Sequence, residues 1–264
     1  TALSIVQSLM RYFFVLRLPE QGARVMLEAT DLAIQIQRLD MASGLAMQFL
    51  ALAERSGDET LLSKGLTIAT NIASISKDPE VLADVAMCQA IGANESGAAK
   101  EAEEYARQGF EGYRTLLLSL KDRKDDDGSL EFKRNDLHNK ISSALSILGF
   151  SLLSQQRYEE AAKAYRHSLQ HERGASIAVN RGQTLHQIGN CESNLGNHVV
   201  AAKLYIEAAK IFHFVGMEEY LSNAFGELGY SLLEVDVPEI SGQLDDNFVS
   251  KALMDLKKDA TRVF

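Results

Sequence analysis

Two histidines, His167 and His171, lie four residues apart and could bind one metal ion from a single helix face. No cysteine or third histidine has a spacing that would complete the site, so the sequence favours two surface histidines. The acidic run 125–127 suggests a calcium loop, but that register puts Arg123 and Arg134 where two carboxylates are needed. We therefore expect no metal and no cofactor.

Catalytic motifs are not found in the sequence either. Gly189 and Gly196 are not followed by the Lys-Ser/Thr pair of a phosphate loop, and there is no Gly-x-Ser-x-Gly run. We expect a protein that is not an enzyme. A helical enzyme or metal-binding protein stays as a weaker alternative, supported only by His167 and His171.

Uncharged amides form the most informative polar pattern. They recur at intervals of 3, 4, 3 and 4 and so share one helix face: Asn180, Gln183, Gln187, Asn190 and Asn194. Apolar residues such as Leu185 and Ile188 fall on the opposite side. Because an amide carries both a donor and an acceptor, such a face can bind the backbone of an extended peptide. The alternative is a plain solvated face.

A repeat of 40 residues positions this stripe. Its fixed points are the pairs 148–149, 188–189 and 228–229, each a Leu or Ile followed by Gly. Ala161 and Tyr165 in the first copy correspond to Ala201 and Tyr205 in the second. A period of this length with helical spacing inside it indicates stacked helical hairpins. A glycine within a helix costs about 1 kcal/mol relative to alanine, so its recurrence predicts close helix crossings.

These residues resemble the tetratricopeptide repeat, in the 40-residue variant found in G-protein-regulator scaffolds and in the C-terminal sensor arrays of signalling ATPases. The resemblance covers about 95 residues. Gln156 replaces the turn glycine of the first copy, and no Trp opens any unit. The family implies that the first helix of each unit lines a concave groove. It therefore implies that the amide stripe faces that groove together with residues of the third unit: Asn223, Glu227 and Tyr230.

Helices are also expected along the N-terminal half, at about 19–38, 41–55, 58–76, 79–91 and 98–120. Asp58 and Asp78 have the positions of N-caps, and Gly57 that of a helix-ending glycine. Residues 1–120 are thus predicted to be degenerate hairpins, 121–136 a charged flexible loop and 137–244 repeats (142–181, 182–221 and a partial 222–244). A capping helix is expected over 245–264.

Composition and charge restrict the partners. The net charge of −9 argues against nucleic acid, and the 16-residue apolar run 3–18, which contains Arg11, is short for a membrane span. That run predicts either a buried helix or a surface for self-association or docking of an upstream domain. Cys88 and Cys191 are expected to be reduced and buried in a cytoplasmic protein.

The sequence therefore predicts an all-α, right-handed solenoid of about six antiparallel helix pairs that binds a protein or a basic or neutral peptide. The alternative function is a regulatory, ligand-sensing domain of a larger signalling or effector protein. Glu227 on the implied groove favours the basic or neutral partner.

Overall fold

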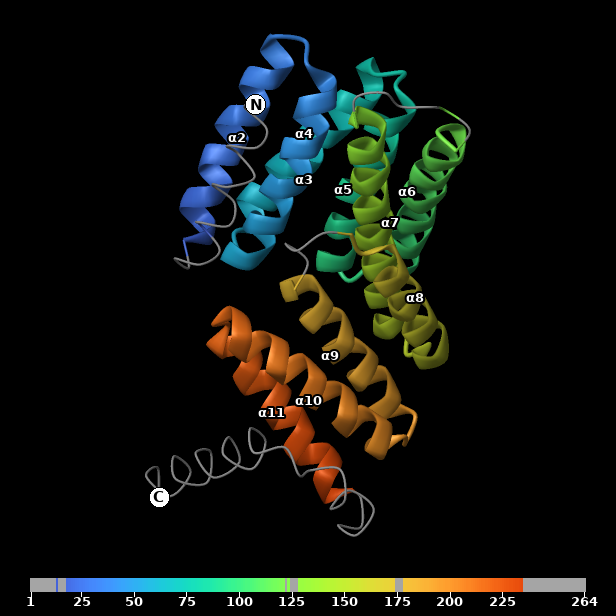
Figure 1. Cartoon of the computed structure of the whole chain (residues 1–264). Coiled ribbons are helices and arrows are strands. Elements are labelled where there is room, and N and C mark those ends of the chain that lie inside the picture. Colours follow the sequence, from blue (N-terminus) through green and yellow to red (C-terminus); the bar gives the residue numbers. More distant parts are fainter. Residues whose placement is uncertain (1–12, 14–17, 122, 124–127, 174–177, 235–264) are drawn as a thin grey trace. The chain divides into compact units, whose positions relative to one another are not determined.

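The computed structural model describes residues 13, 18–121, 123, 128–173 and 178–234. This part of the chain contains no strand and confirms the predicted all-helical repeat architecture. In these described ranges ten helices follow one another (Figure 1): α2 (Pro19–Gln35), α3 (Leu39–Ser56), α4 (Glu59–Ile75), α5 (Pro79–Glu95), α6 (Ala99–Ser119), α7 (Ser129–Ser154), α8 (Tyr158–His171), α9 (Ala178–Asn194), α10 (His198–Val215) and α11 (Glu218–Leu233).

Local signals fix where the N-terminal helices begin and end. The Asp58 carboxylate accepts from the backbone N–H groups of Thr60 and Leu61, and Asp78 caps α5 in the same way. Gly57 ends α3 with a left-handed φ of 67°. Gln156, which replaces a glycine, takes the same conformation with φ of 60° after α7. The turn is therefore kept although an L-residue there costs about 1–2 kcal/mol.

The chain forms two compact units, which are described separately. One contains Thr1–Arg157 with Gln170–Arg173, and the other contains Tyr158–Leu169 with Gly174–Phe264.

In the first unit, consecutive helices from α2 to α7 lie side by side, and α3 also packs on α5 (Figure 1). Phe49, Leu50, Ile72 and Cys88 are among the fully buried residues of its core. Phe13, within the apolar run 3–18, packs against this core; apart from Phe13 and Leu18, that run lies outside the described residues.

Helix α7 begins at Ser129, so the second half of the segment predicted to be a loop is helical. Arg134 explains part of the difference. Its guanidinium donates to the backbone carbonyls of Leu120 at 2.7 Å and Arg123 at 3.0 Å, and so satisfies the end of α6 from the first turns of α7. The sequence pattern could not indicate which charge in this segment binds backbone.

The second unit has α10 between α9 and α11, with which it shares a core of Tyr205, Phe212, Phe225 and Leu228. Its glycines differ in their surroundings. A Cβ added at Gly189 would lie 2.6 Å from the Tyr205 ring, as expected for a close helix crossing. At Gly229, nothing among the described residues lies within 4 Å of that point. The glycine-crossing prediction is thus right for Gly189, whereas no described residue makes such a crossing at Gly229.

Membrane insertion was also considered for the helices. Within the described ranges, none combines the length and apolar character that crossing a bilayer requires. The capping helix expected over 245–264 lies outside the described residues.

Candidate functional site

Helix α9 carries the predicted amide stripe on its accessible side. Asn180 and Asn194 are exposed, and Gln183, Gln187 and Asn190 are half-buried. Leu185 and Ile188, on the opposite side, are 4% and 2% exposed. Helix periodicity alone produces this separation, because residues three and four positions apart share a face.

Asn190 differs from the other amides because it is held inside the fold. Its Oδ1 accepts a 2.8 Å hydrogen bond from the hydroxyl of Tyr205, and its Nδ2 donates to Gln187 at 3.1 Å. Tyr205 is fully buried, and its hydroxyl is satisfied from α9 by this bond together with one to the Ser193 side chain. Asn190 is therefore an anchor between α9 and α10, a role that the sequence did not reveal.

The remaining amides keep free hydrogen-bonding groups. Asn194 donates from Nδ2 to the backbone oxygen of Asn190 at 2.8 Å. The side chains of Asn180, Gln183 and Asn223 make no hydrogen bond to other residues of the described part of the chain. Each leaves a donor and an acceptor available to a ligand.

Helix α11 adds the polar residues that the sequence assigned to the third unit. Asn223 and Glu227 are exposed, and Tyr230 is 54% exposed with its ring edge-on to His198 at 6.4 Å. Burial raises the pKa of Tyr205, and the charge of Glu227 raises it further. Asn190 on α9 and Glu227 on α11 thus both act on Tyr205. We call the accessible polar side of these two helices the α9/α11 face.

A histidine of α9, His186, lies beside the same tyrosine. The His186 ring is 5.4 Å from the Tyr205 ring, and its Nε2 is buried without a hydrogen-bond partner among the described residues. Burial lowers the pKa of His186, so the ring is neutral at pH 7. Among the eight residues predicted for this face, Glu227 is therefore the one that is charged.

His171, first considered with His167 as a metal ligand, contacts another histidine. Nδ1 of His171 lies 2.9 Å from Nδ1 of His138, so one ring donates and the other accepts. No group of three or more His, Cys, Asp or Glu side chains in the described residues is arranged to hold a metal ion. His171 therefore pairs across helices with a residue that spacing did not indicate.

The cysteines are both buried in helices. Burial, with Glu192 nearby, raises the pKa of Cys191 to about 11, which keeps the thiol protonated at neutral pH. Burial likewise raises the pKa of Cys88. Neither thiol has the lowered pKa of a catalytic nucleophile.

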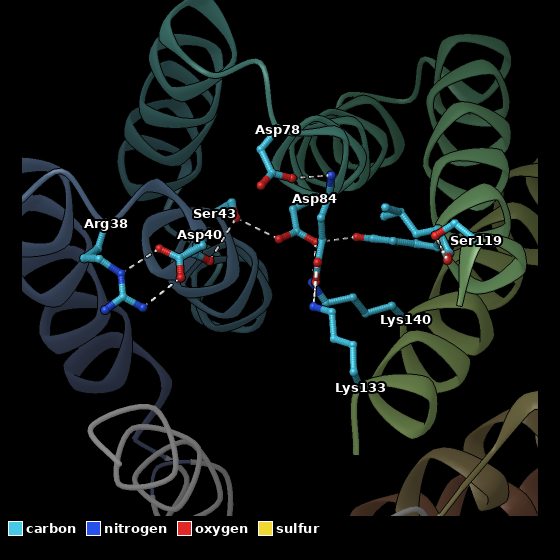
Figure 2. A network of polar contacts seen from close by, with 11 residues as sticks. Arg38, Asp40, Ser43, Asp78, Asp84, Ser119, Lys133 and Lys140 are labelled. Carbon is cyan, nitrogen blue, oxygen red and sulfur yellow. Dashed lines mark hydrogen bonds and ion pairs between the residues drawn. The ribbon is translucent and has the colours of Figure 1, made fainter. Parts of the chain in front are cut away.

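A network of buried charges in the first unit was also missed by sequence analysis. Asp84 is 1% exposed and accepts hydrogen bonds from Ser43 at 2.7 Å, Tyr113 at 2.7 Å and Lys140 at 2.8 Å, as Figure 2 shows in part. Lys140 also binds Glu80 at 3.0 Å. These side chains come from α3, α5, α6 and α7.

The chemistry of this network is structural. Burial alone would lower the pKa of Lys140, but the carboxylates of Asp84 and Glu80 outweigh it and raise that pKa, which keeps the ammonium charged. Both oxygens of Asp84 already have donors. A charged lysine and a carboxylate whose two oxygens both accept hydrogen bonds tie four helices together.

Together these features define a helical-repeat protein with a polar, largely neutral face. No family model matches the chain, and no curated protein matches it. Solved structures do. The apo form of RapI aligns with a TM-score of 0.51 and 15% identity over 84% of this chain, which spans 56% of RapI. BtubC (BKLC) from P. vanneervenii aligns with a TM-score of 0.55 and 18% identity over 90% of this chain and 91% of BtubC. At these identities the likeness is one of fold.

Proposed function

We propose that this protein is a non-enzymatic binding module of the tetratricopeptide type, which holds an extended peptide of a partner protein on the α9/α11 face. The helix starts support the repeat assignment: Ala99 follows Glu59 by 40 residues, and His198 follows Tyr158 by the same interval. The fold shared with RapI and BtubC is consistent with a repeat scaffold.

One observation carries the proposal. The half-buried Gln183 and the exposed Asn223 and Glu227 have no hydrogen-bond partner among the described residues, while the neighbouring Asn190 is locked by Tyr205. A rigid centre surrounded by free donors and acceptors suits a peptide backbone, which presents N–H and C=O groups along its length. Pre-organisation also reduces the entropy that binding must overcome. Glu227 favours a basic or neutral peptide.

The experiment selects peptides from a displayed random library against the whole protein and titrates the recovered sequences by calorimetry. Gln183→Ala and Asn194→Ala should each weaken binding roughly fivefold, as expected for about 1 kcal/mol per lost hydrogen bond. Lys203→Ala, at an exposed site on α10, is the control and should bind as the wild type does.

Asn190→Ala differs from these variants because it also removes the 2.8 Å hydrogen bond that the buried Tyr205 hydroxyl donates. It should lower both stability and affinity. Unchanged affinity in Gln183→Ala and Asn194→Ala, or an equal loss in Lys203→Ala, would show that the peptide does not bind the α9/α11 face.

A further inference from the structure

Helix α4 in the first unit has a surface of unusually low charge. Glu59 and Lys64 are the only charged residues among its 17. Thr67 and Thr70 are exposed, and their hydroxyls donate at 2.9 Å to the backbone oxygens of Ser63 and Leu66. Those two hydroxyl donors are therefore used within the helix and are not available to a ligand. Depletion of charge is a property of the cores of protein interfaces.

Two hollows flank this helix. The larger, of about 640 Å³, lies between α4 and the end of α5; the smaller, of about 350 Å³, lies between α4 and α2. Ser63 and Thr67 line both, so the hollows form one surface on either side of a ridge. We call this the α4 surface.

The floor of the larger hollow depends on a glycine. Leu66 packs onto Gly92, where an added Cβ would lie 2.5 Å from a Leu66 methyl carbon. Leu66 therefore packs closely against α5, beside the open volume of the larger hollow. Leu62 and Leu66 supply the apolar part of this floor.

The polar groups of the α4 surface favour a helical ligand over an extended peptide. An extended peptide needs hydrogen-bond partners along its backbone, but the Thr67 and Thr70 hydroxyls already donate within α4, so the larger hollow has few free donors beyond Ser63 and Asn71. A helix satisfies its own backbone and needs only apolar contact and shape. The lining residues run along α4 from Glu59 to Asn71, roughly 18 Å or three helical turns.

The charged residues of the α4 surface indicate the charge of its partner. Glu59 and Glu95 border the larger hollow, which has no cationic side chain in its lining, and neither acid is paired with a described residue. The smaller hollow has one charge of each sign, Asp31 and Lys64, so the α4 surface as a whole is acidic. A second copy of this chain would bring a net charge of −9 toward these carboxylates. A partner with lysine or arginine beside its apolar residues would be attracted instead.

We propose that the α4 surface is a docking site for an amphipathic, basic helix of a partner protein. Its apolar side chains enter the hollows beside Thr67, and its cationic side chains lie near Glu59 and Glu95. This site is on a different unit from the α9/α11 face and does not depend on it.

The test uses a stapled, fluorescein-labelled helical peptide of roughly 14 residues, with leucines along one face and lysines in its first and last turns. A second peptide has glutamate in place of each lysine. Fluorescence anisotropy with the whole protein should detect binding of the lysine peptide, and the glutamate peptide should bind at least roughly tenfold more weakly.

Thr67→Lys puts a charged, longer side chain between the two hollows and should weaken binding at least roughly tenfold. Thr115→Lys is the matched control, because Thr115 is equally exposed, on α6, and its hydroxyl makes the same bond to the residue four positions earlier. It should leave binding unchanged. Glu59→Gln with Glu95→Gln should weaken binding a few-fold, and more at low salt.

Three results would overturn the proposal. These are no binding of the lysine peptide, equal losses in Thr67→Lys and Thr115→Lys, and loss of binding in Glu227→Gln. The last would show that the peptide uses the α9/α11 face. Because Thr67 is exposed, Thr67→Lys should keep the circular dichroism and thermal midpoint of the wild type, so any loss reports on the surface.

Discussion

Alanine substitution of two glycines with the same place in the repeat should have opposite effects on stability. Gly189 and Gly229 both follow an apolar residue within a helix, 40 positions apart. Alanine is favoured over glycine in a helix by about 1 kcal/mol at either site. The sites differ in what the new methyl group meets.

At Gly189 the Cβ would lie 2.6, 2.9 and 3.0 Å from three carbons of the Tyr205 ring. That ring cannot move aside easily, because it is fully buried and its hydroxyl is bonded to Asn190. Overpacking of this kind costs about 1–3 kcal/mol, which exceeds the gain in helix propensity. Gly189→Ala should therefore lose about 1 kcal/mol of stability, and Gly189→Leu at least about 3 kcal/mol.

At Gly229 the methyl group would enter space free of described atoms. Gly229→Ala should therefore gain up to about 1 kcal/mol. The assay is urea and thermal unfolding followed by circular dichroism, with about 2–4 °C expected per kcal/mol. Equal shifts of the same sign in the two alanine variants would refute the packing explanation.

Two further predictions concern buried ionisable groups. Lys140→Met should cost about 3–5 kcal/mol in urea unfolding, because it leaves Asp84, which is 1% exposed, without its cation. Lys133→Met, at a half-exposed lysine, should cost under about 1 kcal/mol. Similar losses in the two variants would contradict the burial argument. Burial lowers the pKa of His186 below 6.5, so the unfolded chain takes up a proton that the folded chain does not, and stability should be complete above about pH 6.5 and fall below it. His186→Phe should reduce this fall between about pH 7.5 and 5.5, with His138 supplying part of the remainder, and an unchanged slope would contradict it.

Local interactions explain what could be predicted from the sequence. The starts of α4 and α5 were predicted because Asp58 and Asp78 cap the backbone only two or three residues away. The exposed side of α9 was predicted because the periodicity of polar and apolar residues can be recognised without knowing which helices pack against α9. The ends of a helix and the side that it exposes depend on short stretches of sequence, so both can be predicted from the sequence alone.

The role of an individual side chain depended on which helices meet. Gly189 lies against Tyr205, while no described residue outside its own helix lies close to Gly229, although their sequence contexts match. Asn190 looked like its neighbouring amides until Tyr205, 15 residues away in the sequence, was found bonded to it. Lys140 and Asp84 pair across 56 residues. Hydrogen bonds and packing act over a few ångströms in space, and helical periodicity cannot specify which distant residue occupies that space.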